Sequence, residues 1–176
     1  MKNRELSIRV DSEQVAALIK KGTISILETV ADNLSKKATY VNSLIYVHDD
    51  GNFYIPTYKK TDIVSIREPF IIENGVVRYK ADHPDESNTW KPSVNMKPEY
   101  ARLNATVTDV YAIRLHDMKK KDFILAGFKN KDDFVEWWDG CVRKNIRVGK
   151  GRKEKMELFG WNANPMVWVY VLERNE

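Results

Sequence analysis

Residues 166–172 read MVWVYVL, a run in which every position carries an apolar or aromatic side chain. A run this short and this rich in β-branched and aromatic residues is typical of a strand that is buried on both faces. We therefore expect residues 166–172 to form the strand that closes a sheet, and the remaining strands of that sheet must come from earlier in the chain.

Alternating apolar and polar residues predict these other strands, because side chains on a strand point in turn to its two faces. In residues 105–115, for example, Val107, Tyr111 and Ile113 share one face and Thr108 lies on the other. The same pattern predicts strands over residues 6–10, 24–30 and 62–66.

Two dipeptides predict tight β-hairpins. The hairpins pair residues 44–47 with 53–55 across Asp50-Gly51, and residues 70–72 with 76–79 across Asn74-Gly75. Both dipeptides suit type I′ turns, because the two central residues of such a turn need positive φ. Residues 31–40, which are polar, and residues 82–98, which contain three prolines, are expected to be irregular.

Three short helices are expected, over residues 11–22, about 118–126 and 130–141. Candidate N-caps are Asp11 (with Gln14 as its capping-box partner), Asp117 and Asn130, and candidate stops are Gly22 and Gly127. Strands outnumber helices, and the helices are too few for a parallel βαβ sheet. The sequence therefore predicts an α+β fold with a barrel-like arrangement, in one domain spanning residues 1–176.

The helix over residues 130–141 has an aromatic face. Phe134, Trp137, Trp138 and Cys141 follow the i, i+3, i+4, i+7 spacing that buries one side of a helix. Adjacent tryptophans leave a helix in different directions, so one is expected in the core and the other partly exposed, where it could anchor a partner or a base. Cys141 is expected to be a buried structural thiol.

Positive charge is concentrated in one segment. The chain has a net charge of +4, yet residues 143–155 alone carry seven basic residues against one acidic residue. We expect this segment to be a loop inserted before the last strands, where it attracts phosphate groups without reading sequence. Its basic residues are Arg143, Lys144, Arg147, Lys150, Arg152, Lys153 and Lys155.

Composition also limits the cellular compartments and the cofactors that can be expected for this protein. The single cysteine cannot form an internal disulfide, and no apolar run is long enough for a signal peptide or a membrane span. A cytoplasmic protein without a membrane partner is expected. The three histidines are isolated and no glycine-rich dinucleotide fingerprint is present, so neither a metal nor a cofactor is expected.

Three stretches resemble the ASCH domain family of the PUA-like superfamily, in its phage and prophage form. Residues 6–9, with the following helix that ends at Gly22, resemble the family's opening strand and helix. Residues 66–70 (IREPF), with 79–82 and 90–96 (WKPSVNM) leading to Ala101-Arg102, resemble a phage-type central motif. Residues 164–169 (NPMVWV) resemble the closing strand.

This resemblance implies a PUA-like mixed β-barrel with a cleft that faces the opening helix. Relatives of this kind bind RNA or modified nucleosides, and some small members hydrolyse acylated cytidines or cut RNA. The hydrolytic members carry a lysine two positions after the glycine that ends the opening helix. Ile24 holds that position here, which argues against amidohydrolase activity and leaves the enzymatic assignment open, leaning towards none.

The candidate site lies around the central motif. Trp90 could stack a base, Asn95 could bond a base edge, and Arg67 or Arg102 could bind a phosphate. Each of them could equally be structural, for instance with Arg67 paired to Glu68 or Asp82. The predicted nucleoside-binding residues are Arg67, Glu68, Trp90, Ser93, Asn95, Arg102 and Asn164, with Glu68 also a weak candidate for a catalytic base.

Three functions remain open from the sequence. The first is binding of RNA, single-stranded nucleic acid or a modified nucleoside. The second is a hydrolase of the same fold, either an N-acyl-cytidine amidohydrolase or a ribonuclease. The third is a phage protein that acts on a host protein through the basic segment and an exposed tryptophan. Nothing in the sequence sets the oligomeric state.

Overall fold

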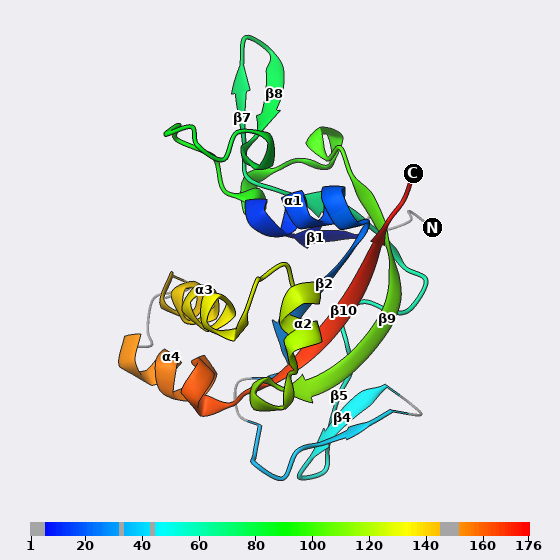
Figure 1. Cartoon of the computed structure of the whole chain (residues 1–176). Coiled ribbons are helices and arrows are strands. Elements are labelled where there is room, and N and C mark those ends of the chain that lie inside the picture. Colours follow the sequence, from blue (N-terminus) through cyan, green and yellow to red (C-terminus); the bar gives the residue numbers. More distant parts are fainter. Residues whose placement is uncertain (1–5, 32–33, 43–44, 145–151) are drawn as a thin grey trace.

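The computed structural model describes residues 6–31, 34–42, 45–144 and 152–176 (Figure 1). The α+β class expected from the sequence is confirmed, and the largest element is a five-stranded mixed sheet. Its strands are, in sheet order, β1 (Ser7–Arg9), β6 (Ile63–Arg67), β9 (Asn104–Arg114), β10 (Met166–Arg174) and β2 (Thr23–Thr29). β1 and β6 are parallel, and every other neighbouring pair is antiparallel.

Strand β10 is buried on both faces, as its apolar sequence predicts. Trp168 and Tyr170 point into a core that β1, β2, β6 and β9 share with α1 (Ser12–Lys21). Val167 and Val169 point the opposite way, into a second core. The alternation of side chains along one strand therefore serves two separate hydrophobic layers.

The second core lies between β10 and a group of helices. The helices that contribute to it are α2 (Lys120–Leu125) and α3 (Lys131–Lys144), and α4 (Arg152–Phe159) lies beside α3, where the Phe159 carbonyl accepts from Trp138 Nε1 at 2.8 Å. Phe134 and Trp138 on α3 are buried there, while Trp137 is only partly buried. The expected division between one core tryptophan and one partly exposed tryptophan is confirmed.

Two smaller sheets flank the main one. They are β3 (Thr39–Val41), β4 (Tyr46–Asp49) and β5 (Asn52–Tyr54) in one, and β7 (Phe70–Glu73) with β8 (Val76–Tyr79) in the other. Asp50-Gly51 and Asn74-Gly75 all have positive φ, between 47° and 79°, so both predicted hairpins are confirmed. The β7–β8 hairpin projects from the rest of the molecule (Figure 1). Strand β3 lies partly within a segment that was expected to be irregular.

Short 3-10 helices complete the chain. Three of them lie in the proline-containing segment after β8, and the other two flank α2 and β10. They are η1 (Lys80–Asp82), η2 (Ser93–Asn95), η3 (Pro98–Tyr100), η4 (Leu115–Asp117) and η5 (Trp161–Ala163).

Two of the expected helix caps are wrong. Asp11 precedes α1 but makes no capping hydrogen bond, because its carboxylate accepts one from Trp137 Nε1 at 2.7 Å. Gln14 is buried and donates to the Ala126 carbonyl instead of closing a capping box. Asp117 lies in η4, and the cap of α2 comes from Asp122, which accepts from the Lys119 amide.

The other caps are as expected. Asn130 Oδ1 accepts from the Asp133 amide at 2.9 Å, at the start of α3. Gly22 follows α1 with φ 77°, in the left-handed region that favours glycine.

The basic segment differs from the loop expected over residues 143–155. Its first two residues belong to the last turn of α3, and residues 152–155 begin α4, a fourth helix that the sequence reading missed. The charge of the segment masked its helical character, because lysine, arginine and glutamate are all good helix formers. Arg147 and Lys150 lie outside the described residues.

The main sheet does not close into a barrel by hydrogen bonding among the strands described. β1 and β2 are its two edges, and β9 and β10 curve strongly between them (Figure 1). Across the described parts of the chain, none of the helices combines the length and apolar character required to span a bilayer.

Candidate binding cleft

A cleft of about 710 Å³ lies between the main sheet and the helical pair α3–α4. β1 and β2, the two edges of the sheet, both line it, through residues 8–9 and 26–29. Two opposite edges can reach one cleft only if the sheet curls, which agrees with the bend of β9 and β10 in Figure 1. The remaining lining residues are Tyr58, Ser93, Trp137, Trp138, Cys141, Val142, Lys155, Phe159 and Tyr170.

A pair of arginines lies on the sheet side of the cleft. Arg9 lines it directly, and Arg67 is its partner in the parallel register of β1 and β6. Register partners on adjacent strands point to the same face, so the two guanidinium groups extend from one surface. Neither makes an ion pair with a carboxylate of the described residues, and the buried Nε of Arg67 has no hydrogen-bond partner among them.

Tyr58 is close to both arginines. Burial raises the pKa of its hydroxyl, as does the charge of Glu28, whereas the positive charges of Arg9 and Arg67 lower it. The hydroxyl donates to the Ser7 carbonyl at 2.6 Å, which fixes the ring beside β1. The tyrosine therefore gives the cleft an immobilised aromatic side chain next to two cations.

Glu28 supplies a carboxylate on the β2 side of the cleft. Its Oε2 accepts from the Tyr170 hydroxyl at 2.7 Å, and its Oε1 accepts from the Thr57 hydroxyl at 3.2 Å. Burial and this bond to Glu28 raise the pKa of Tyr170 far above that of a free tyrosine, so the phenol stays protonated and donates. The acidic group is thus held by hydroxyl donors rather than by an arginine.

Trp137 forms part of the opposite wall. Its indole Nε1 donates to Asp11, two residues after the end of β1, so this bond links the two sides of the cleft. The ring also packs against Phe128, with centroids 4.9 Å apart. The indole is therefore anchored at one edge and held on one face.

Cys141 and Lys155 complete this wall. Cys141 is only partly buried and lines the cleft, so the expectation of a fully buried thiol is wrong. Lys155 enters from α4 and is the residue of the predicted basic segment that reaches the cleft among the described side chains. The side chains of Arg143, Lys144, Arg152 and Lys153 lie outside what the structure describes.

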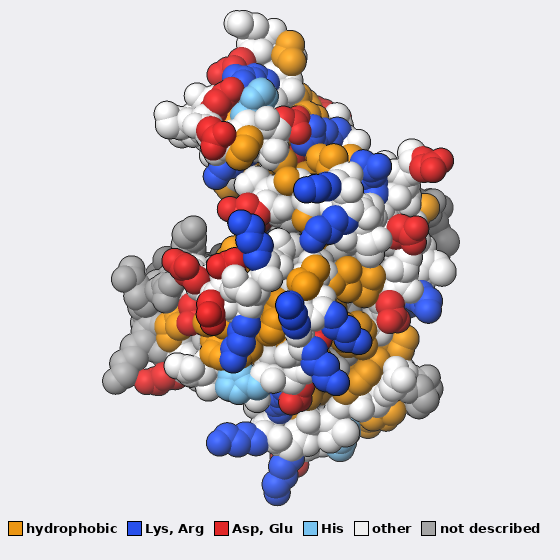
Figure 2. Space-filling view, viewed as in Figure 1, with side chains coloured by type: hydrophobic (Ala, Val, Ile, Leu, Met, Phe, Trp, Pro, Cys, Tyr) orange, Lys and Arg blue, Asp and Glu red, His pale blue; other side chains and the backbone are white. Residues whose placement is uncertain are grey.

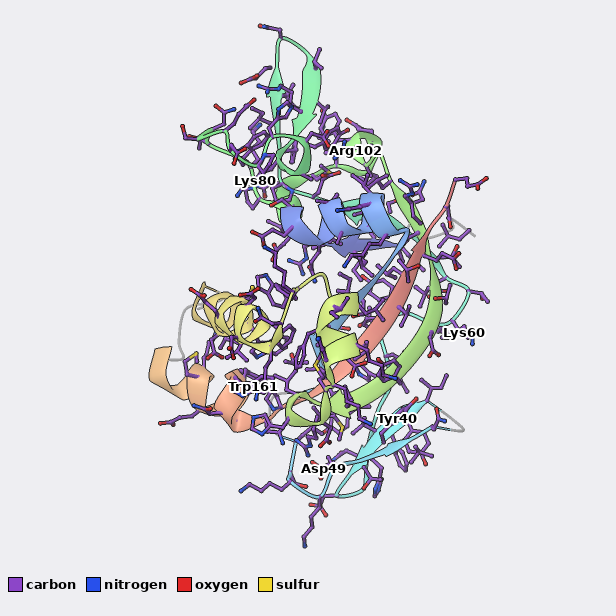
Figure 3. All side chains as sticks on the ribbon, in the orientation of Figure 1. Tyr40, Asp49, Lys60, Lys80, Arg102 and Trp161 are labelled. Atoms are coloured by element: carbon purple, nitrogen blue, oxygen red, sulfur yellow. The ribbon has the colours of Figure 1, made fainter. Side chains whose placement is uncertain are left out.

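The predicted site around Arg102 has a different character. Arg102 bonds Glu68 through Nε at 2.8 Å and through Nη2 at 3.1 Å, and Nη2 also donates to Asp82 at 3.0 Å. Its guanidinium carbon lies 4.1 Å from the centre of the Tyr79 ring. This cluster lies below the β7–β8 hairpin, at the place labelled Arg102 in Figure 3.

Glu68 is fully buried in this cluster. Burial raises the pKa of its carboxyl, and the hydrogen bonds and charge of Arg102 oppose that shift. The expected alternative of an Arg67–Glu68 pair is wrong, because neighbouring residues of an extended chain point to opposite sides. Arg67 faces the cleft side with Arg9, while Glu68 faces Arg102.

The other predicted site residues are dispersed. Ser93 lines the cleft, but Asn95 is exposed on η2. Trp90 stacks on His83, with ring centroids 6.4 Å apart. Asn164 adopts a left-handed conformation before β10, and its Oδ1 accepts from the His116 amide, which is a structural role.

The structure therefore brings together only part of the predicted set. Ser93 lies in the cleft and Arg67 lies beside it, whereas Glu68 and Arg102 bond each other elsewhere. The cleft residues that the sequence reading did not single out include Arg9, Glu28, Tyr58 and Tyr170. Arg9 and Glu28 each lay on a predicted strand, and the place of a charged Glu28 on the same face as Ile24 and Ile26 was a signal that could have been used.

The described residues offer no cluster of three or more His, Cys, Asp or Glu side chains suited to holding a metal ion. Comparison with known proteins gives no further guide to the ligand, since no family model, no curated protein and no solved structure matches the chain.

Proposed function

We propose that this chain is a nucleic-acid or modified-nucleoside binding domain of the ASCH/PUA-like type, and that a nucleotide occupies the cleft between the sheet and α3–α4. The observation that carries the proposal is the arginine pair Arg9 and Arg67, which has no carboxylate partner among the described residues.

Two neighbouring guanidinium groups repel each other, and a buried guanidinium nitrogen without an acceptor is costly. A phosphate bound at the guanidinium ends relieves the repulsion, since it is dianionic or monoanionic and presents several oxygens to the donors of arginine. The pair is thus better matched to a phosphate than to any group on the protein.

The aromatic residues of the cleft suit a base. Trp137 and Tyr58 lie on opposite walls, and each is fixed by a hydrogen bond at its polar atom. Stacking a base on such a ring contributes about 1–3 kcal/mol and tolerates any base. A volume of about 710 Å³ lies within the range of small-molecule sites, which is roughly 300–1,000 Å³.

The curl of the main sheet supports the PUA-like part of the proposal. The two sheet edges β1 and β2 meet at one cleft and enclose one hydrophobic core. The cleft also borders β1, the strand that leads directly into the opening helix α1. The resemblance of residues 6–22, 66–102 and 164–169 to ASCH domains implies a cleft that faces this helix, and here the cleft lies beside the strand that precedes it, with no residue of α1 in its lining.

Hydrolysis is the second candidate, and Glu28 is the residue that favours it. Its carboxylate lies in the cleft, where it could activate a water molecule as a general base. Glu68 is a poorer candidate for that role, because it is fully buried and bonded to Arg102. Ile24 is also buried in the core, so the position of the hydrolytic lysine carries no titratable group.

Calorimetric titration with nucleoside 5′-monophosphates and with the matching nucleosides tests the proposal. The wild type should bind the monophosphates more tightly, and Arg9→Ala should weaken them about 10- to 100-fold, since a charge-assisted hydrogen bond contributes about 1.5–3 kcal/mol. Arg78→Ala is the matched control, because Arg78 is already paired with Glu73 and Glu86 on the projecting hairpin.

Equal binding of nucleosides and monophosphates, or equal losses in Arg9→Ala and Arg78→Ala, would contradict the proposal. For the hydrolase alternative, turnover of an N-acyl-cytidine or of a short RNA that disappears in Glu28→Gln would be the supporting result.

A further inference from the structure

Lysines from two distant parts of the chain share one surface. Lys20 and Lys21 end α1, Lys120 and Lys121 begin α2, and all four are exposed. Figure 2 shows Lys and Arg side chains gathered over α1 and α2 on this side of the molecule. We call these four lysines, together with Arg174 at the end of β10, the basic face.

Several contacts fix the members of the basic face relative to one another. Lys21 Nζ donates to the Ile124 carbonyl of α2 at 3.4 Å, and Arg174 donates to the Ile19 carbonyl of α1 at 3.2 Å. Below them, the buried Gln14 side chain of α1 donates to the Ala126 carbonyl at 3.1 Å. These contacts hold α1, α2 and the end of β10 together, so the positively charged side chains have fixed positions relative to one another.

The basic face is not neutralised by the acids that surround it. Within the described residues, none of its five members forms an ion pair with a carboxylate. The nearest acid on α2, Asp122, is occupied as the cap of the Lys119 amide, and on β10 the exposed Glu173 precedes Arg174. The surface keeps an excess of positive charge.

The helix dipole explains the positions of only two of these four lysines. Lys20 and Lys21 lie in the last turn of α1, where the helix dipole favours cations. Lys120 and Lys121 lie in the first turn of α2, where the same dipole disfavours them. Positive charge that opposes the local helix preference, placed beside two further lysines, indicates a role in binding an anionic partner.

We propose that the basic face binds the sugar–phosphate backbone of a nucleic acid that is longer than the nucleotide in the cleft. The lysines are spread over two helices, which suits a partner with successive phosphates rather than a single anion. A membrane surface suits it less well, because Ile124 is the single large exposed apolar residue of α2.

This inference goes beyond the cleft, because none of the five residues lines it. It stands whether or not a mononucleotide binds there. If both surfaces bind, the ligand is a polymer that reaches from one to the other, and a free nucleoside is only part of it.

The test compares two quadruple variants with the same change in net charge. Lys20, Lys21, Lys120 and Lys121 are replaced by Gln in the first, and Lys36, Lys37, Lys59 and Lys60 in the second. The second set is also two exposed adjacent pairs, and Lys60 lies on the loop to the right of β9 in Figure 3. Fluorescence anisotropy follows labelled 20-nucleotide RNA and DNA, single- and double-stranded, from low to moderate salt.

We expect the first variant to bind each oligonucleotide at least tenfold more weakly than wild type. The slope of log affinity against log salt should fall by about 0.7–0.9 for each lysine that contacts a phosphate. The control should keep the wild-type slope, and both variants should keep the wild-type melting temperature to within a few degrees.

Equal losses in the two variants would overturn the proposal, because net charge alone would explain them. Unchanged oligonucleotide binding in the first variant would also overturn it, as would binding of wild type to phosphatidylserine vesicles but to no oligonucleotide. The Arg9→Ala variant tests the cleft separately from the basic face. If it loses mononucleotide binding but keeps the wild-type salt dependence of oligonucleotide binding, the basic face binds the oligonucleotide independently of the cleft.

Discussion

The neighbouring residues Arg67 and Glu68 belong to two arginine environments that differ in their surroundings. Glu68 is buried and holds Arg102 in a partly exposed cluster, where that guanidinium bonds two carboxylates and packs on Tyr79. The preceding residue, Arg67, points the other way and stands beside Arg9 with no carboxylate partner among the described residues.

The comparison shows that residue type does not decide whether an arginine serves the fold or a ligand. Arg102 has used its donors inside the protein and has little left to offer a phosphate. Arg9 and Arg67 have kept theirs, at the cost of mutual repulsion. The cluster at Arg102 is therefore expected to control stability, and the pair at the cleft is expected to control binding.

The largest effect should come from Arg102→Ala. This change leaves the fully buried Glu68 without its cation, which costs about 3 kcal/mol of folding free energy, the lower end of the range for a buried pair because Arg102 itself is partly exposed. Denaturant unfolding measures the loss. Arg9→Ala, at an exposed position without a partner, should change the same free energy by less than about 0.5 kcal/mol.

A double variant sharpens this prediction. Replacing both Glu68 and Arg102 by Leu removes the buried charge together with its partner, so it should recover part of the stability that Arg102→Ala loses. If the double variant is no more stable than Arg102→Ala, the loss does not come from an uncompensated carboxylate.

Trp137→Phe should have the next largest effect. It removes the bond from the indole to Asp11, which links α3 to the start of α1, and a hydrogen bond to a charged group contributes about 1.5–3 kcal/mol. Thermal unfolding reports the change. Asp11→Asn keeps an acceptor oxygen at the same place and should cost less, so equal losses in the two variants would argue against this bond as the cause.

The variant Arg67→Met tests the arginine pair at the cleft. Removing one of two repelling charges, and a buried nitrogen that lacks a partner, should leave stability unchanged or raise it by up to about 1 kcal/mol. The same variant should bind nucleoside monophosphates more weakly. A marked loss of stability would show that Arg67 has a structural partner like that of Arg102.

The smallest effect concerns tyrosine ionisation on each side of the comparison. Burial and Glu28 raise the pKa of Tyr170, and burial raises the pKa of Tyr79, whose ring packs on Arg102. Both tyrosines therefore stabilise the fold fully below pH 10.0, and their contribution falls as the pH rises above that value. Melting temperatures between about pH 9 and 11 should therefore fall more slowly in Tyr170→Phe than in wild type. Tyr79→Phe should show a weaker version, because Arg102 opposes its shift.

Most of the fold was predictable because its signals are local. Alternation along residues 105–115, the unbroken apolar run of 166–172 and the two glycine-containing turns each depend on neighbouring residues only. The missed elements were those whose local composition pointed elsewhere. The high charge of residues 152–155 suggested a loop where α4 begins, and the polar composition of residues 31–40 suggested irregular structure where β3 begins.

The site was harder to predict because it depends on pairings between distant residues. Arg9 and Arg67 meet only through a parallel register that no local pattern encodes. Asp11 looked like a helix cap, but its carboxylate bonds Trp137, 126 positions away. Arg102 was predicted to bind a nucleoside, but its partners Glu68 and Asp82 come from other parts of the chain, and no local pattern shows that its donors bond them.

The most direct test of the central claim uses the indole N–H signals of the protein in ¹⁵N-labelled form. The signals of Trp137 and Trp90 are assigned from their loss in Trp137→Phe and Trp90→Phe, and a nucleoside 5′-monophosphate is then titrated in. A ligand in the cleft should shift the Trp137 signal and leave Trp90 in place, and in Arg9→Ala the same shift should need about 10- to 100-fold more ligand. A shift of Trp90 with Trp137 unmoved would place the ligand near the Arg102 cluster and contradict the account.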